Sequence, residues 1–161
     1  MNNALVHVRL GLIFALLTLL FGIVMGISFG IDEDAYKSWI AQGIAAYPNL
    51  HDADSQENIW RYAQRAHFHA TGIAAFSLGL ILVVALSGMR AQFKKITSAL
   101  IGLSGFYPLS WFSIFYLSPS MGREPAHHAL ITEIFVFIGV GSLLLGLAIL
   151  IIHLLFNSWR A

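Results

Sequence analysis

The stretch IFVFIGVGSLLLGLAILIIHLLFN, residues 134–157, decides the fold, because it contains no Asp, Glu, Lys or Arg. A helix needs about 20 consecutive apolar residues to cross the hydrocarbon core of a bilayer, and this stretch is long enough. Three further stretches also lack these residue types and are also long enough to cross, and they cover residues 10–31, 70–89 and 96–122. The sequence therefore predicts an all-α, integral membrane four-helix bundle that forms a single domain over residues 1–161.

The composition agrees with this prediction. The chain is 58% hydrophobic and 11% charged, whereas a soluble domain is about a quarter charged. The continuous apolar runs also exclude a membrane β-barrel, whose strands alternate apolar and polar residues over about ten positions. The first run is longer than the apolar core of a signal peptide, so we expect it to be retained as a span. The absence of cysteine excludes disulfides, thiolate metal sites and covalent c-type haem.

Charge predicts the orientation in the membrane. The side with both termini and the loop between the second and third spans carries no acid, and its basic residues are Arg9, Arg90, Lys94, Lys95 and Arg160. The opposite side carries most of the acids, together with Lys37, Arg61, Arg65 and Arg123. Cytoplasmic loops are enriched in Lys and Arg, so we expect both termini in the cytoplasm and the chain in a bacterial cytoplasmic membrane. No basic patch indicates a nucleic-acid partner.

Residues 32–60 are predicted to form an external segment. Within it, Asp34 is a candidate cap for a short helix over 35–46, which would lie on the membrane surface. Asp54 and Glu57 have the spacing of a capping box, so the second membrane helix should begin near Ser55, outside the lipid.

Two prolines bear on the later helices. Pro108 predicts a kink in the third span, because proline removes a backbone hydrogen bond inside a helix. Pro125 suits the first turn of the fourth helix, where the missing N–H costs nothing.

Four histidines form two clusters near the outer ends of the second and fourth helices. His67 and His69 lie about 200° apart on a helix, so they do not face the same partner. The helix face that includes His69 also contains glycines. The helix face that begins at His128 contains small residues at Gly139, Ser142 and Gly146. The pattern favours His69 and His128 as the facing pair, with His67 and His127 as alternates.

Such a pair predicts a cofactor. Two imidazoles from two helices can hold haem b, small residues leave room for the macrocycle, and Arg65 could pair with a propionate. A copper or zinc site at His69 and His128 is the alternative, with Met121 or nearby carboxylates as further ligands. Interfacial histidines that only meet water or headgroups are the third interpretation.

Glu133 is the candidate catalytic residue. It lies five positions beyond His128, at the start of an apolar stretch. An ionisable group at the edge of a span indicates a functional role unless it is paired, protonated or hydrated. We expect it to exchange a proton with a quinol or with a chain of waters. The alternatives are a protonated carboxyl that bonds to a neighbouring side chain, with Tyr107, Ser110 and Trp111 of the third helix as candidates, and a carboxyl that reaches up to the interface.

The stretch Ala66-His67-Phe68-His69-Ala70-Thr71-Gly72, which continues into Phe76, Ser77, Leu78 and Gly79, carries a resemblance. It resembles the His-x-His-x-x-Gly helix segments of small four-helix membrane proteins related to the large subunit of haem–copper oxidases. The resemblance implies haem-associated redox chemistry at the outer face. Four spans do not supply the histidines for a low-spin haem and a haem–copper centre together, so we do not expect oxygen reduction by this chain alone.

These observations predict a small b-type cytochrome-like membrane protein that passes electrons between quinol and a membrane or periplasmic partner. The expected partners are the lipid bilayer, a quinone and other membrane redox subunits, and an oligomer is compatible with the sequence. The alternatives are a non-catalytic accessory subunit of a larger membrane complex and a copper- or zinc-handling membrane protein. An electron-transfer or accessory role fits better than a stand-alone enzyme.

Overall fold

The computed structural model describes residues 3–159, and all regular elements in this range are helices. In chain order they are α1 (Asn3–Val6), α2 (Arg9–Ala46), the 3-10 helix η1 (Pro48–Leu50), α3 (Ser55–Leu86), α4 (Ala91–Leu103), α5 (Phe106–Met121), α6 (Arg123–His127) and α7 (Leu130–Phe156). Four segments are long and apolar enough to cross a membrane: α2, α3, α4 with α5, and α7. The predicted all-α four-helix membrane bundle is confirmed. Arg160, one of the basic residues predicted to lie on the cytoplasmic side, is outside the described residues.

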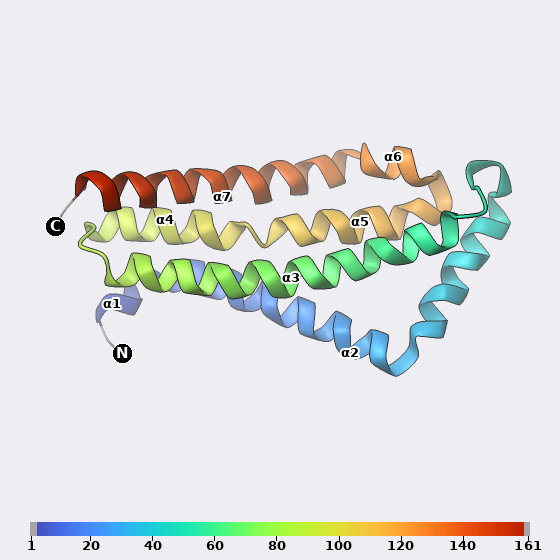
Figure 1. Ribbon diagram of the computed structural model, residues 1–161, viewed down its shortest axis with the longest axis horizontal. Helices are drawn as coiled ribbons and strands as arrows, with labels where there is room; N and C mark the ends of the chain where they lie inside the picture. The colour runs from blue at the N-terminus through green and yellow to red at the C-terminus, as the bar shows by residue number, and fades with distance from the viewer. Residues whose placement is uncertain (1–2, 160–161) are drawn as a thin grey trace.

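The third span is the centre of the packing. In Figure 1, α7, the α4–α5 pair and α3 lie side by side, and α2 runs along α3. The α4–α5 pair contacts α2, α3 and α7, whereas α7 packs mainly on α4 and α5. Small residues permit these close approaches: a Cβ at Gly102 would lie 2.6 Å from the carbonyl oxygen of Gly11. This tight contact holds α4 against α2 near the end of the bundle where both termini lie (Figure 1).

The first span bends sharply at Asp32, where the backbone leaves the helical conformation (φ −152°, ψ 73°). The Asp32 Oδ1 atom accepts a hydrogen bond of 2.9 Å from the backbone N–H of Ala35. Asp32 therefore caps the second half of α2, and the prediction of Asp34 as the cap was wrong by two positions. Beyond the bend the helix crosses the end of the bundle (Figure 1).

The third span is interrupted at Ser104 and Gly105, just before Pro108 in the first turn of α5. Pro108 has no N–H to donate to the carbonyl of Ser104, and that carbonyl instead accepts a hydrogen bond of 3.0 Å from the backbone N–H of Tyr107. The Ser104 hydroxyl donates to the carbonyl of Ile101 and lies 3.0 Å from the Ser77 hydroxyl of α3. The third span is therefore interrupted near Pro108, as predicted, and a local backbone turn together with the Ser104 hydroxyl supplies hydrogen bonds at the interruption.

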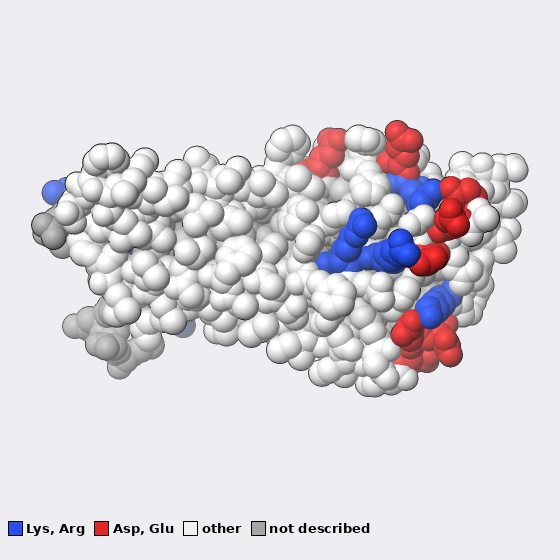
Figure 2. Space-filling view, viewed as in Figure 1, with Lys and Arg blue, Asp and Glu red and all other residues white. Residues whose placement is uncertain are grey.

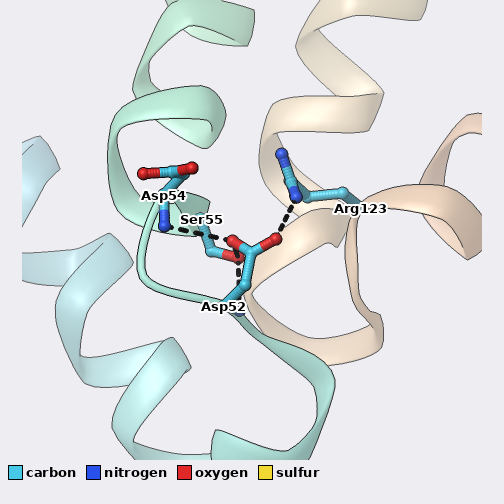
Figure 3. A network of polar contacts seen from close by, with 4 residues as sticks. All are labelled: Asp52, Asp54, Ser55 and Arg123. Carbon is cyan, nitrogen blue, oxygen red and sulfur yellow. Dashed lines mark hydrogen bonds and ion pairs between the residues drawn. The ribbon is translucent and has the colours of Figure 1, made fainter.

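The second span begins at Ser55, as predicted, but with a different cap. Asp54 makes no capping hydrogen bond through its side chain. Instead, Asp52 Oδ1 accepts hydrogen bonds from the Asp54 N–H at 3.1 Å and the Ser55 hydroxyl at 2.8 Å (Figure 3). Asp52 Oδ2 also pairs with Arg123 of α6 at 2.5 Å. The Ser55 hydroxyl and then the Arg123 guanidinium lower the pKa of the Asp52 carboxyl below its ordinary value.

The fourth helix begins later than Pro125 predicts. Pro125 lies in the short helix α6, and the chain leaves the helical path at His128 and Ala129 (Ala129 φ −61°, ψ 136°). The Thr132 hydroxyl donates to the carbonyl of Ala126 at 3.0 Å across this break. A single helix from Pro125 onward is therefore a wrong prediction, and His127 and His128 belong to no common helix with α7.

Charged side chains are concentrated at one end of the molecule. Figure 2 shows blue and red atoms over α6, the neighbouring part of α3 and the bend of α2, while few charged atoms are visible toward the other end on the face drawn. Both termini lie at that other end (Figure 1). That end carries Arg9, Arg90, Lys94 and Lys95 without an acid. The positive-inside rule therefore predicts that it faces the cytoplasm and that the opposite end faces outward.

This orientation can be tested with single cysteines, because the chain has none of its own. Ser38 and Gln92 are both exposed and lie at opposite ends of the bundle. In intact cells, an impermeant maleimide should label Ser38→Cys, and it should label Gln92→Cys only after the membrane is permeabilised. Labelling of Gln92→Cys alone from outside would show that the orientation is inverted.

Candidate functional site

Aromatic, imidazole and guanidinium side chains gather around Trp111 of α5, in the half of the bundle away from the termini, which the charge distribution predicts to be the outer half. The ring centroid of His69 on α3 lies 5.8 Å from that of Trp111, and the centroid of His127 on α6 lies 6.0 Å from it. His69 also contacts Tyr107 at 5.2 Å, and His127 contacts Tyr62 at 5.1 Å. We call this group, with Arg65, the outer aromatic cluster: Tyr62, Arg65, His69, Tyr107, Trp111 and His127.

Arg65 provides a positive charge without an acidic partner. Its guanidinium carbon lies 4.9 Å from the ring centroid of Trp111 and 5.8 Å from that of Tyr62. Arg61 pairs with Glu57, and Arg123 pairs with Asp52. Among residues 3–159, no carboxylate pairs with Arg65. Its donors are therefore available to an anionic group at the membrane surface.

His127 is held in its neutral form. Burial lowers the pKa of its imidazole below the ordinary value, and the neighbouring His128, Arg65 and Arg123 lower it further. Because an unperturbed histidine titrates at about pH 6.5, a lowered pKa leaves His127 uncharged at neutral pH. A neutral imidazole has the free nitrogen lone pair that a metal or haem iron requires.

His128 does not face His69. Its side chain is 72% exposed, and its Nδ1 atom lies 3.6 Å from Oε1 of Glu133. The inward orientation predicted for His128 was wrong, because the break after α6 uncouples its direction from the small-residue row of α7. The structure instead brings His127 into the cluster with His69.

His67 lies on a different face of α3. Its Nδ1 atom is 2.8 Å from the carbonyl oxygen of Gly22, and its ring contacts Phe29. Both partners belong to α2, so His67 joins α2 to α3 and does not meet the other candidate histidines.

Glu133 is partly exposed at the start of α7, with 46% of its side chain accessible and His128 as its neighbour. Tyr107 and Trp111, which the sequence offered as partners for it, face His69 instead. The neighbouring Thr132 is buried and hydrogen-bonds to Ser113 of α5 at 2.8 Å.

A hollow of about 650 Å³ opens beside the cluster at the outer surface. Tyr62 and His127 form part of its wall, and Met121, Arg123 and His128 also line it. The volume is within the range of small-molecule sites. Trp111 lies next to this region, and its buried indole Nε1 has no hydrogen-bond partner.

The sequence contained a signal for this cluster. Tyr62, Arg65 and His69 are separated by three and four residues, which places them on one face of α3. Tyr107 and Trp111 are four residues apart on α5 and share a face in the same way. What the spacing did not reveal was that these two faces meet each other and His127.

A metal site has less support. Within the described residues, no three His, Asp or Glu side chains come close enough together to hold a metal ion. His69 and His127 could supply two ligands, and further ligands would have to come from outside this group.

No family model matches the chain, and neither curated proteins nor solved structures include a significant match.

α7 packs closely on α5 at Tyr107, a member of the outer aromatic cluster. This contact helps to fix the position of Tyr107. A Cβ at Gly139 would lie 2.4 Å from the backbone nitrogen of Tyr107, whereas a Cβ at Gly141 would have no atom within 4 Å. Gly139→Ala should therefore lower the stability by about 1–3 kcal/mol and reduce the Tm in detergent. Gly141→Ala is the matched control and should leave the Tm unchanged or slightly raised. Equal melting of the two variants would contradict the close packing of α7 on α5.

Proposed function

We propose that this chain is a small membrane redox protein of the b-type cytochrome kind, which passes electrons between quinol and a membrane or periplasmic partner. Its haem b would lie at the outer end of the bundle, with His69 and His127 as axial ligands. The observation that carries the proposal is the convergence of these two imidazoles, from two separate helices, on one indole beside an arginine without an acidic partner.

The donor set fits a haem. Two imidazoles are the usual axial ligands of a low-spin haem b, which supplies one-electron redox chemistry when bound. Arg65 is positioned to pair with a propionate by charge-assisted hydrogen bonds. The α3 surface below His69 has room for a flat ring, because Cβ atoms at Gly72 and Gly79 would have no neighbour within 4 Å.

Trp111 is the side chain that would have to move. It contacts both imidazoles, so it occupies space that a macrocycle ligated by them would need. Its Nε1–H makes no hydrogen bond, so rotation of the side chain breaks none. The indole would then pack against the edge of the macrocycle in place of the imidazoles.

Glu133 and His128 are assigned to proton uptake in this proposal. Oxidation of a quinol to a quinone releases two electrons and two protons, and the protons need acceptors near the electron acceptor. Glu133 Oε1 and His128 Nδ1 lie 3.6 Å apart, and both side chains are accessible from outside the bundle. An exposed carboxylate and imidazole can act as general bases toward a donor at the membrane surface.

One observation favours the accessory-subunit alternative. Since α7 packs mainly on α4 and α5, α3 keeps an open face that carries Gly72, Gly79 and the exposed Phe76. Glycines on an open face allow a neighbouring transmembrane helix to approach closely. A larger membrane complex could use this face in place of a cofactor.

Absorption spectra of ligand variants test the proposal. The purified protein, supplied with haem during expression, should show a Soret band and the sharp α and β bands of a reduced low-spin haem. His69→Ala and His127→Ala should each abolish the low-spin spectrum, because each removes an axial nitrogen. His67→Ala and His128→Ala are the matched controls from the same two clusters and should retain it.

Two results would contradict the proposed ligands. Loss of the spectrum in His128→Ala with retention in His127→Ala would return the site to His69 and His128. A parent protein that binds no haem and co-purifies with other membrane subunits would favour the accessory role.

A further inference from the structure

The short helix α6 is separated from the long helices on both sides. Before it, Gly122 has φ 86° and ψ 160°, a conformation that is essentially restricted to glycine. After it, the backbone leaves helical dihedral angles at His128 and Ala129. Neither α5 nor α7 therefore fixes the direction of α6 by helical continuity, and its position depends on the contacts that its own residues make.

Asp52 presents a fixed carboxylate beside α6, at the start of α3 (Figure 3). Its Oδ1 atom accepts hydrogen bonds from the Ser55 hydroxyl at 2.8 Å and from the Asp54 N–H at 3.1 Å. The Asp52 N–H in turn donates to the Ser55 hydroxyl oxygen at 3.0 Å. These bonds restrict the rotation of the Asp52 side chain and leave its second oxygen, Oδ2, for another donor.

That oxygen bonds to the first residue of α6. The Arg123 guanidinium donates to Asp52 Oδ2 at 2.5 Å. Charge-assisted hydrogen bonds are stronger than neutral ones, and an acceptor that is already ordered loses less entropy when the bond forms. Arg123 and His127 are four residues apart, so they lie on one face of the α6 turn. The ion pair therefore ties the start of α3 to the segment that carries His127.

The residue before Asp52 contacts the other side of the same junction. The His51 Nε2 atom lies 3.1 Å from the carbonyl oxygen of Pro119, in the last turn of α5. Residues 51 and 52 thus contact the chain both before and after Gly122. His51 holds the α5 side of this junction, and Asp52 holds the α6 side.

We propose that Asp52 is a positioning residue of the candidate site, which acts through Arg123 to hold α6 in place and so keeps His127 against Tyr62 and Trp111. When the ion pair is broken, α6 opens as a unit about its two flanking breaks, and His127 leaves the cluster with it. The consequence for haem retention rests on the proposed function, whereas the opening of α6 does not.

Thiol labelling of the haem-free protein in detergent micelles tests the opening of α6. Ala126 is fully buried on α6, and the chain has no cysteine, so Ala126→Cys should react with a water-soluble maleimide only when α6 opens. The labelling rate then follows the open population. Asp52→Asn keeps Oδ1 as an acceptor but removes the charge, and it should raise this rate about 2- to 5-fold. Asp54→Asn, the same change at a residue whose side chain makes no capping bond, should leave the rate unchanged.

Two further variants show whether Asp52 acts through Arg123. Arg123→Met should raise the labelling rate as Asp52→Asn does, whereas Arg123→Lys keeps the charge and should stay near the parent rate. The double variant of Asp52→Asn with Arg123→Met should label no faster than either single variant, because both remove the same pair. Ala63→Cys, at a fully buried position of α3, should label at the same rate with and without Asp52→Asn.

Hydrogen exchange gives the same comparison without the added cysteine. The Ala126 N–H bonds to the Gly122 carbonyl at 3.3 Å, and peptides that cover residues 122–129 should exchange faster in Asp52→Asn than in Asp54→Asn.

The proposal is overturned if Asp52→Asn and Arg123→Met leave both the labelling of Ala126→Cys and the exchange of residues 122–129 at the parent rates. It is also overturned if the two effects add, or if Ala63→Cys is accelerated as much as Ala126→Cys, since Asp52 would then act through the start of α3. Faster loss of bound haem in Asp52→Asn is the expected consequence for the proposed function. Unchanged haem loss together with a more open α6 would contradict His127 as a ligand and leave the role of Asp52 intact.

Discussion

Backbone hydrogen bonding inside the bilayer is the constraint on which this structure depends, because a lipid-exposed N–H or C=O has no water to bond to. The backbone leaves helical dihedral angles at Asp32 and at residues 128–129. The third span is also interrupted between α4 and α5, although Ser104 and Gly105 keep right-handed helical angles. The Asp32 carboxylate caps the helix that follows it, and the Ser104 carbonyl accepts from the next turn. At the third break, the Thr132 hydroxyl bonds across to the preceding short helix. At each of these three places a side chain or a local turn supplies a hydrogen bond to the backbone.

These breaks position the candidate site. The interruption before α5 starts a new helix whose first turns present Tyr107 and Trp111 to α3. The break after α6 lets His127 turn toward the same indole while His128 faces outward to Glu133. The result is a half-buried imidazole at His127 and an exposed imidazole at His128. His127 contacts aromatic rings near Arg65, whereas His128 lies beside Glu133.

Sequence reasoning succeeded where the signal is local and failed where it depended on an uninterrupted helix. Length and apolarity predicted the four spans, because membrane insertion depends on those two properties alone. The start of the second span at Ser55 and the kink at Pro108 were also predicted correctly. The orientation of His128 was predicted wrongly. The prediction assumed a continuous helix with about 100° of rotation per residue, but the helix breaks at residues 128–129 and the side-chain directions before and after the break are not related in that way. The cap at Asp32 was missed because several acids in a row can each serve, and only the path of the bent chain selects among them.

The claim on which the haem proposal depends is that His127, and not His128, faces α3 beside Tyr62. Because the chain has no cysteine, two double variants can test it directly: Tyr62→Cys with His127→Cys, and Tyr62→Cys with His128→Cys. The rings of Tyr62 and His127 are 5.1 Å apart, so the first pair should crosslink rapidly with a short bifunctional thiol reagent in native membranes. The second pair should react slowly or not at all. Rapid crosslinking of the pair at 62 and 128, with none at 62 and 127, would contradict this arrangement.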